Sequence, residues 1–176
     1  MKIHYLKTPI KDSVLEKLSA GDIVYLSGDV FTARDTAHKL KCSMIKKGRK
    51  LPFDIKGEIV YYCGPAPGRK KGSIGSCGPT TSSRMDRYTP LLLDKGIKAM
   101  IGKGVRSGEV VRSIVKNKAV YFAAPAGLGA LLSKCVRKSE VLAFRELGPE
   151  AVYRFNVEDM PLIVAVDSKG KCIYKA

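Results

Sequence analysis

The residue types best suited to chemistry in this chain are concentrated in the segment GPTTSSRMD, residues 78–86. Thr80 and Thr81 offer hydroxyl groups to an anion. Arg84 adds a planar guanidinium that grips a carboxylate through two charge-assisted hydrogen bonds, and Asp86 could hold this guanidinium from behind. A helix that begins here would add free N–H groups and a positive dipole end. The segment therefore predicts an anion site, and its alternative is a capped helix with a surface Arg–Asp pair.

A second segment, SGDVFTARDTAH at residues 27–38, repeats this combination of a glycine, hydroxyl groups and an arginine beside an aspartate. It follows a strand-like stretch at residues 22–26, so we expect a loop that carries Arg34 into a helix. Asp35 is expected to orient Arg34, and His38 is expected to lie on the polar side of that helix. Two such corners in one small domain indicate that each binds one end of a single ligand.

An alternation of strands and helices must position these corners. We expect strands at residues 3–6, 22–26, 58–63, 98–102, 119–124, 140–146, 152–157 and 162–167, and helices at residues 13–18, 33–47, 82–95, 107–117 and 126–135. The helix at 33–47 is expected to face the core with Ala33, Ala37, Leu40 and Met44. Pro90 is expected to kink or break the helix at 82–95, and a hairpin through residues 167–170 is expected to end the fold. The two corners would then lie beyond the carboxyl ends of strands, where α/β sheets bind ligands.

The motifs TARDTAH and GPTTSSRMD together resemble the β subunit of class I iron-sulfur fumarate hydratase and of its sister enzyme L-tartrate dehydratase. Three more matches follow in the same order: YYCGP at residues 61–65, MIGKG at 100–104, and the tail at 146–161. The likeness covers nearly the whole chain. It implies a single domain, residues 1–176, with the α/β fold of a layered swivelling β/β/α domain and a partly mixed sheet.

The resemblance also implies the reaction and the residues that carry it. The chain would be the β subunit of an enzyme that reversibly hydrates fumarate to L-malate, with L-tartrate dehydratase as the alternative. By motif, Arg34, Arg84 and Lys103 would bind the carboxylates of this small dicarboxylate, with Thr81 beside them. Thr80 is the family's candidate base. Because a free hydroxyl is a weak base near neutral pH, we interpret Thr80 first as a positioning residue.

The resembled enzymes depend on a 4Fe-4S cluster, which three cysteines of the iron-sulfur α subunit hold. The five cysteines of this chain contain no C-x-x-C pair. Cys63 and Cys77 flank a glycine-rich loop at residues 64–78, but a role as small apolar residues is favoured for both. We therefore expect that this chain binds no cluster alone, and that it forms a hetero-oligomer with the α subunit or a homodimer when isolated.

Length and composition are typical of one folded domain, because 176 residues with 45% hydrophobic content can bury a core. No window approaches the roughly 20 apolar residues that a membrane helix needs, and the first residues lack the apolar stretch of a signal peptide. We therefore expect a cytoplasmic protein without a membrane partner.

The net charge of +16 is the feature that fits this interpretation least. Such a charge is typical of nucleic-acid-binding proteins, and basic clusters occur at residues 46–50 and 69–71. The chain nevertheless has no Trp and no aromatic ladder of the kind that stacks on RNA bases. A basic RNA-binding module without catalysis therefore stays as the disfavoured alternative.

Overall fold

Seven strands form one mixed sheet in residues 1–68 and 74–174, which are the residues that this computed structural model describes. They are β1 (Ile3–Lys7), β2 (Ile23–Thr32), β3 (Ile59–Tyr61), β4 (Ala99–Gly102), β5 (Val120–Ala123), β6 (Val136–Ala143) and β7 (Val152–Val166). Strands β1 to β5 run parallel to one another. Strand β7 pairs antiparallel with β5 and with β6. Because β7 pairs with both β5 and β2, the sheet closes on itself. The expected α/β class with a partly mixed sheet is confirmed.

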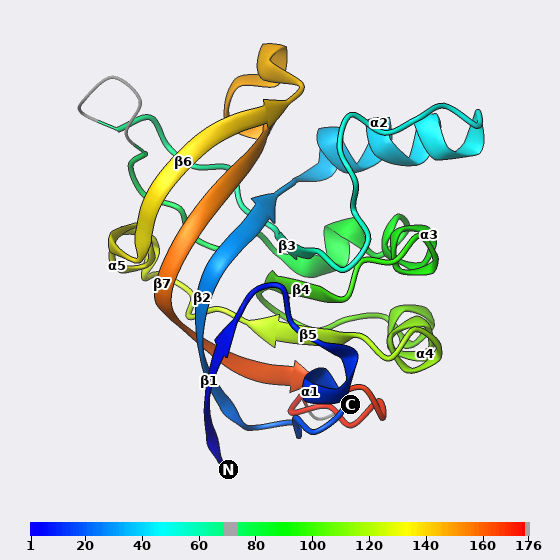
Figure 1. The fold of residues 1–176 in the computed structure, drawn as a ribbon, viewed down its shortest axis with the longest axis vertical. Coiled ribbons are helices and arrows are strands. Elements are labelled where there is room, and N and C mark those ends of the chain that lie inside the picture. Colours follow the sequence, from blue (N-terminus) through cyan, green and yellow to red (C-terminus); the bar gives the residue numbers. More distant parts are fainter. Residues whose placement is uncertain (69–73, 175–176) are drawn as a thin grey trace.

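Short helices cover the outside of this sheet. They are α1 (Asp12–Leu15), α2 (Asp35–Lys46), α3 (Thr89–Asp94), α4 (Gly108–Lys116) and α5 (Gly129–Lys134), with 3-10 turns η1 (Ser82–Met85) and η2 (Arg145–Glu150). Helices α2, α3 and α4 lie together on the right of the sheet in Figure 1, whereas α5 lies on the left, next to strand β6. The basic cluster at residues 69–71 and part of the glycine-rich loop lie outside the described residues.

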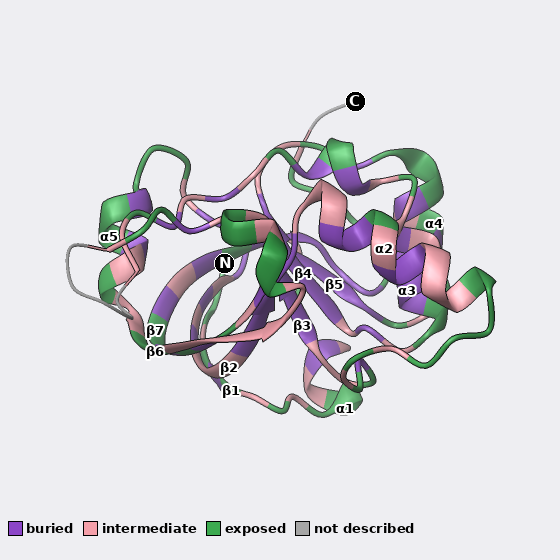
Figure 2. Ribbon diagram, turned by 90° about the horizontal axis from the view of Figure 1, so that it is seen from above, coloured by how far each residue is buried: buried purple, intermediate pink, exposed green. Residues whose placement is uncertain are grey.

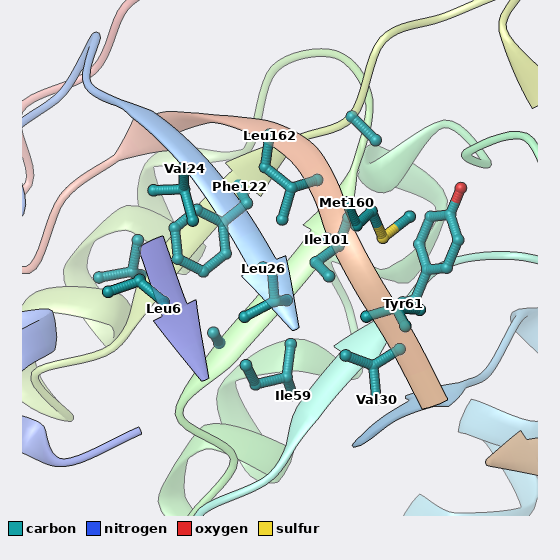
Figure 3. Packing of buried hydrophobic residues seen from close by; sticks show 14 of the residues in the cluster. Leu6, Val24, Leu26, Val30, Ile59, Tyr61, Ile101, Phe122, Met160 and Leu162 are labelled. Carbon is teal, nitrogen blue, oxygen red and sulfur yellow. The ribbon is translucent and has the colours of Figure 1, made fainter. Parts of the chain in front are cut away.

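Two apolar clusters, one on each face of the parallel strands, form the core (Figure 2). Ile101 of β4 and Phe122 of β5 belong to the cluster that β2 and β7 enclose, which Figure 3 shows from close by. Their sequence neighbours Met100 and Tyr121 belong to the second cluster, beneath the helices. Both faces are buried because side chains alternate along a strand. Each such side chain contributes roughly 1.5–3 kcal/mol when it is fully buried.

The segment that leads to Arg34 is a strand and not the expected loop. Strand β2 continues through residues 27–32 and pairs with β7 along this part. Its register shifts between Leu26 and Gly28, where the backbone φ of Gly28 is 104°. A side chain at Gly28 would collide with Thr8, so the glycine permits the bulge. The glycine of this motif therefore permits a bend in a strand.

The expected helix at residues 82–95 is also wrong. A four-residue 3-10 turn, η1, is followed by a separate helix, α3, which has Pro90 in its first turn. Proline favours that position because its missing N–H would have no helical partner there. The expected helix is therefore broken and not kinked, and Pro90 lies in the first turn of its second part.

The C-terminal strands are longer than expected, because β7 is one 15-residue strand where two were predicted. The closing hairpin is confirmed: Gly170 N donates to Asp167 O at 2.9 Å, and Val166 forms an antiparallel bridge with Cys172.

Candidate functional site

Backbone hydrogen bonds bring Thr80 and Lys103 together at the carboxyl ends of β3 and β4. Thr80 N donates to Tyr62 O at 2.6 Å, and Lys103 N donates to Thr80 O at 3.3 Å. Ser82 N donates in turn to Lys103 O at 2.9 Å, and Thr81 forms a parallel bridge with Lys103. Thr81 is exposed, whereas Thr80 and Lys103 are half-buried. Residues 80–82 thus pair with Lys103 like a short extra strand beside the end of β4.

The first turn of a helix does not supply the donors of this site, contrary to expectation. The turn η1 has only four residues, and no side chain caps it. Ser82 N, which would be a free donor at a helix start, is already bonded to Lys103 O. Side-chain cations and hydroxyl groups are therefore the anion-binding groups that this corner offers.

Arg34 immediately precedes α2 and packs against the residues that follow β3. Its Nη2 lies 3.7 Å from Glu150 Oε1, and its side chain is 27% exposed. Its Nε is buried and has no hydrogen-bond partner among the described residues. A Cβ atom on Gly64 would lie 2.7 Å from Arg34 Cδ, so the glycine leaves room for the arginine. A buried donor without a partner costs free energy, so Arg34 is held in this position at some cost to stability.

Arg84 is held by Asp35 and not by Asp86. Its Nε lies 3.1 Å from Asp35 Oδ1 and its Nη2 lies 2.7 Å from Asp35 Oδ2, which is a bidentate pair. The Arg84 side chain is half exposed. The expectation that Asp35 orients Arg34 and that Asp86 orients Arg84 is therefore wrong, but the pair that does form joins the two predicted corners.

Asp86 instead binds Arg106, a residue that the sequence analysis missed. Asp86 Oδ1 lies 2.7 Å from Arg106 Nε, and Asp86 Oδ2 accepts from Ser107 N at 2.7 Å. The Arg106 side chain is fully buried and also donates to Thr89 Oγ1 at 2.8 Å. Its guanidinium lies over the ring of Tyr62. This network packs against Tyr62, whose backbone carbonyl accepts the hydrogen bond from Thr80 N. In the sequence, the available signal for Arg106 was its position directly before Ser107, the residue that caps α4.

His38 is buried in α2 and does not lie on its polar side as expected. Its Nδ1 is 2.8 Å from Arg34 O, and its ring packs against Tyr62 and Tyr88. Burial, together with the nearby charge of Lys41, lowers the pKa of His38 well below its ordinary value. The neutral imidazole therefore supports the backbone of Arg34 from within the protein.

The core-facing side of α2 also differs from the expected stripe of apolar residues. Ala37, Lys41 and Cys42 are buried with His38, whereas Leu40 and Met44 are only half-buried. Burial lowers the pKa of Lys41 to about 8. The helix turns this partly polar face inward because the tyrosines of the neighbouring elements cover it.

The cysteines of this chain do not fit an iron-sulfur cluster. Cys63 and Cys77 are buried, and the hydrogen bond that they share, together with burial, raises the pKa of the Cys63 thiol. The same hydrogen bond lowers the pKa of the Cys77 thiol, so the two cysteines are paired with each other. In residues 1–68 and 74–174, no group of three or more His, Cys, Asp and Glu side chains could hold a metal ion.

The fold is an α/β domain, and this edge of its sheet carries cations and hydroxyl groups. A profile of the Fumarase C-terminus family matches residues 2–176. A protein of Methanocaldococcus jannaschii, provisionally named L(+)-tartrate dehydratase subunit beta, is 41% identical over 99% of this chain and 92% of its own length. The chain therefore belongs to the Fumarase C-terminus family, and the resemblance of the two motifs is confirmed.

Other relatives carry two kinds of name. The L(+)-tartrate dehydratase subunit beta of Escherichia coli is 34% identical over 94% of this chain and 83% of its own length. Fumarate hydratase 2 of Leishmania major is 39% identical over 96% of this chain, which corresponds to only 30% of that enzyme. The chain thus spans most of the tartrate dehydratase subunits but about a third of the fumarate hydratase. The relatives are hydro-lyases, and the beta subunits among them imply a partner subunit.

None of the helices in the described parts of the chain has the length and apolar character that a membrane crossing requires. The relatives give no support to the RNA-binding alternative.

Proposed function

We propose that this chain is the β subunit of a class I hydro-lyase, and that it binds the dicarboxylate substrate at the carboxyl ends of β2, β3 and β4. The proposed reaction is the reversible hydration of fumarate to L-malate. The observation that supports it most is that backbone hydrogen bonds join Thr80 and Lys103 at this edge of the sheet, while the Arg84–Asp35 pair joins the two predicted corners. In this proposal residues 1–176 act as one domain.

The carboxylates of the substrate would be bound by Arg34, Arg84 and Lys103. Arg34 has a donor to spare. Arg84 uses Nε and Nη2 for Asp35, which leaves Nη1 for a ligand. Lys103 and the exposed Thr81 lie on the same short strand pair as Thr80. These groups offer charged hydrogen bonds to two carboxylates from fixed backbone positions.

Removal of a proton beside a carboxylate places extra negative charge on that group. Arg34, Arg84 and Lys103 would stabilise this charge, which is the usual effect of cations aimed at a developing anion. Thr80 would first orient the substrate. It would serve as the base only if the same cations lower its pKa strongly or if it relays the proton to another group.

The iron-sulfur cluster of this enzyme class would reside on an α subunit, because the cysteines of the present chain do not fit one. The chain would therefore act only as part of a hetero-oligomer in the cytoplasm. The high positive charge would help it to associate with an acidic partner.

L-tartrate dehydratase is the second candidate, and the relatives' lengths favour it. Both tartrate dehydratase beta subunits match over most of their own length. The two substrates differ at a hydroxyl group, so a comparison of kcat/KM for L-malate and L-tartrate with the assembled enzyme would separate the two candidates.

The test is reconstitution with an iron-sulfur α subunit under anaerobic conditions. Only the mixture should turn over substrate, and Arg84→Ala should lower kcat/KM by roughly 10²- to 10⁴-fold. Arg87→Ala is the matched control, since Arg87 is an exposed arginine of the same segment that stacks on Tyr88. Equal activity of the two variants would refute the site. Tight, salt-sensitive RNA binding without association to an α subunit would favour the alternative module.

A further inference from the structure

Glu150 ends η2, the segment that connects β6 to β7 and extends from the end of the sheet near α2 (Figure 1). The carbonyl of Gly148 accepts a hydrogen bond of 3.0 Å from Tyr153 Oη, which ties this segment to β7. The segment also contacts α2. The position of Glu150 beside the start of α2 is therefore fixed from two sides.

The two carboxylate oxygens of Glu150 have different partners. Oε2 accepts a hydrogen bond of 3.2 Å from Thr36 N, in the first turn of α2. Oε1 lies 3.7 Å from Arg34 Nη2. A carboxylate is favourable at this end of a helix. The bond to Thr36 thus anchors Glu150, and the anchored carboxylate faces the guanidinium.

Arg34 is confined on its other side as well. A Cβ atom on Gly64 would lie 2.8 Å from Arg34 Nη1 and 2.9 Å from Pro149 O, so both groups pack directly on this glycine. The neighbouring Asp35 is occupied by Arg84. Among the described residues, Glu150 is the carboxylate that pairs with Arg34.

We propose that Glu150 is the positioning residue for Arg34, and that it holds the partly exposed guanidinium in place for a carboxylate ligand. An arginine side chain carries about 2 kcal/mol of rotamer entropy. If Glu150 fixes this side chain before a ligand arrives, binding no longer bears the whole cost of ordering it. The inference rests on the proposed function for the identity of the ligand, but not for the contact between Glu150 and Arg34.

The experiment measures how fast phenylglyoxal, a reagent for guanidinium groups, modifies Arg34 in the isolated chain, by peptide mass spectrometry. Glu150→Ala should raise this rate about two- to fivefold, the range that a partly exposed ion pair allows. Glu158→Ala is the matched control, since Glu158 pairs with the exposed Arg137 and should leave the rate at Arg34 unchanged.

A second variant separates the charge of Glu150 from its anchoring bond. Glu150→Gln can still accept the hydrogen bond from Thr36 N, so amide exchange at Thr36 should rise only in Glu150→Ala. Both variants should increase the modification of Arg34. An unchanged rate at Arg34 in either variant would overturn the proposal, and folding is checked by the unaltered rate at Arg137.

The assembled enzyme gives an independent readout. Glu150→Ala should raise KM for the dicarboxylate two- to fivefold and change kcat less, since Arg34 would bind the substrate less well. A lower KM would overturn the proposal, because Glu150 would then compete with the substrate for Arg34. Faster modification of Arg34 with an unchanged KM would support the positioning contact and refute the use of Arg34 in the proposed function.

Discussion

The buried pair of Asp86 and Arg106 provides the strongest test of how the 78–86 segment is held. The Arg106 side chain is 0% exposed, and Asp86 is 15% exposed. In Asp86→Ala the guanidinium would stay buried without its carboxylate, and Ser107 N would lose its acceptor. Breaking one partner of a buried pair costs about 3–5 kcal/mol, which is a large part of the roughly 5–15 kcal/mol that stabilises a typical protein.

Urea denaturation of the isolated chain at pH 7 measures this loss as a change in the free energy of unfolding. Asp94→Ala is the matched control, because Asp94 pairs with the exposed Lys116 and such pairs contribute about 0–1 kcal/mol. We expect a loss several times larger for Asp86→Ala than for Asp94→Ala. Losses of the same size in both variants would refute the argument, since the Arg106 guanidinium would then be hydrated well enough to remain stable without Asp86.

Three further predictions follow from single contacts. Gly64→Ala should destabilise the chain by about 1–3 kcal/mol and raise the KM of the assembled enzyme, because the new Cβ would collide with Arg34. The control, Gly108→Ala at the start of α4, should be neutral or stabilising in a thermal melt. Lys41→Met should stabilise the chain near pH 7 in urea denaturation. In the unmodified chain, the lowered pKa of Lys41 makes the free energy of unfolding rise with pH between about 8 and 10.5. This rise should vanish in Lys41→Met, and a persistent rise would contradict the burial of Lys41. A thiol reagent should modify exposed Cys172 first, and faster reaction at a buried cysteine would contradict the packing of Cys42, Cys63 and Cys77.

The strand and helix pattern could be predicted where apolar spacing alone decides it. Helix α4 agrees with the expected 107–117 helix. Its cap, Ser107, accepts a hydrogen bond from Val110 N. The parallel strands β3, β4 and β5 could be predicted because each is a short apolar run. The long β7 was missed, since β2 pairs with both of its halves and this long-range pairing leaves no local signal in the sequence.

The partners of the site residues could not be predicted, because they depend on side-chain directions in three dimensions. Arg84 and Asp86 are two positions apart on a tight turn, and residues with this spacing do not face each other. Arg84 therefore points to α2 and finds Asp35, whereas Asp86 points inward to Arg106. The burial of His38 has the same origin, since it depends on Tyr62 and Tyr88 from other elements.

The most direct test of the proposed site is a crystal structure of this chain with its α subunit and a bound dicarboxylate such as tartrate. We predict that one carboxylate of the ligand lies within hydrogen-bond distance of the Arg34 guanidinium and the other near Arg84 and Lys103. A ligand bound away from these three cations would contradict the account.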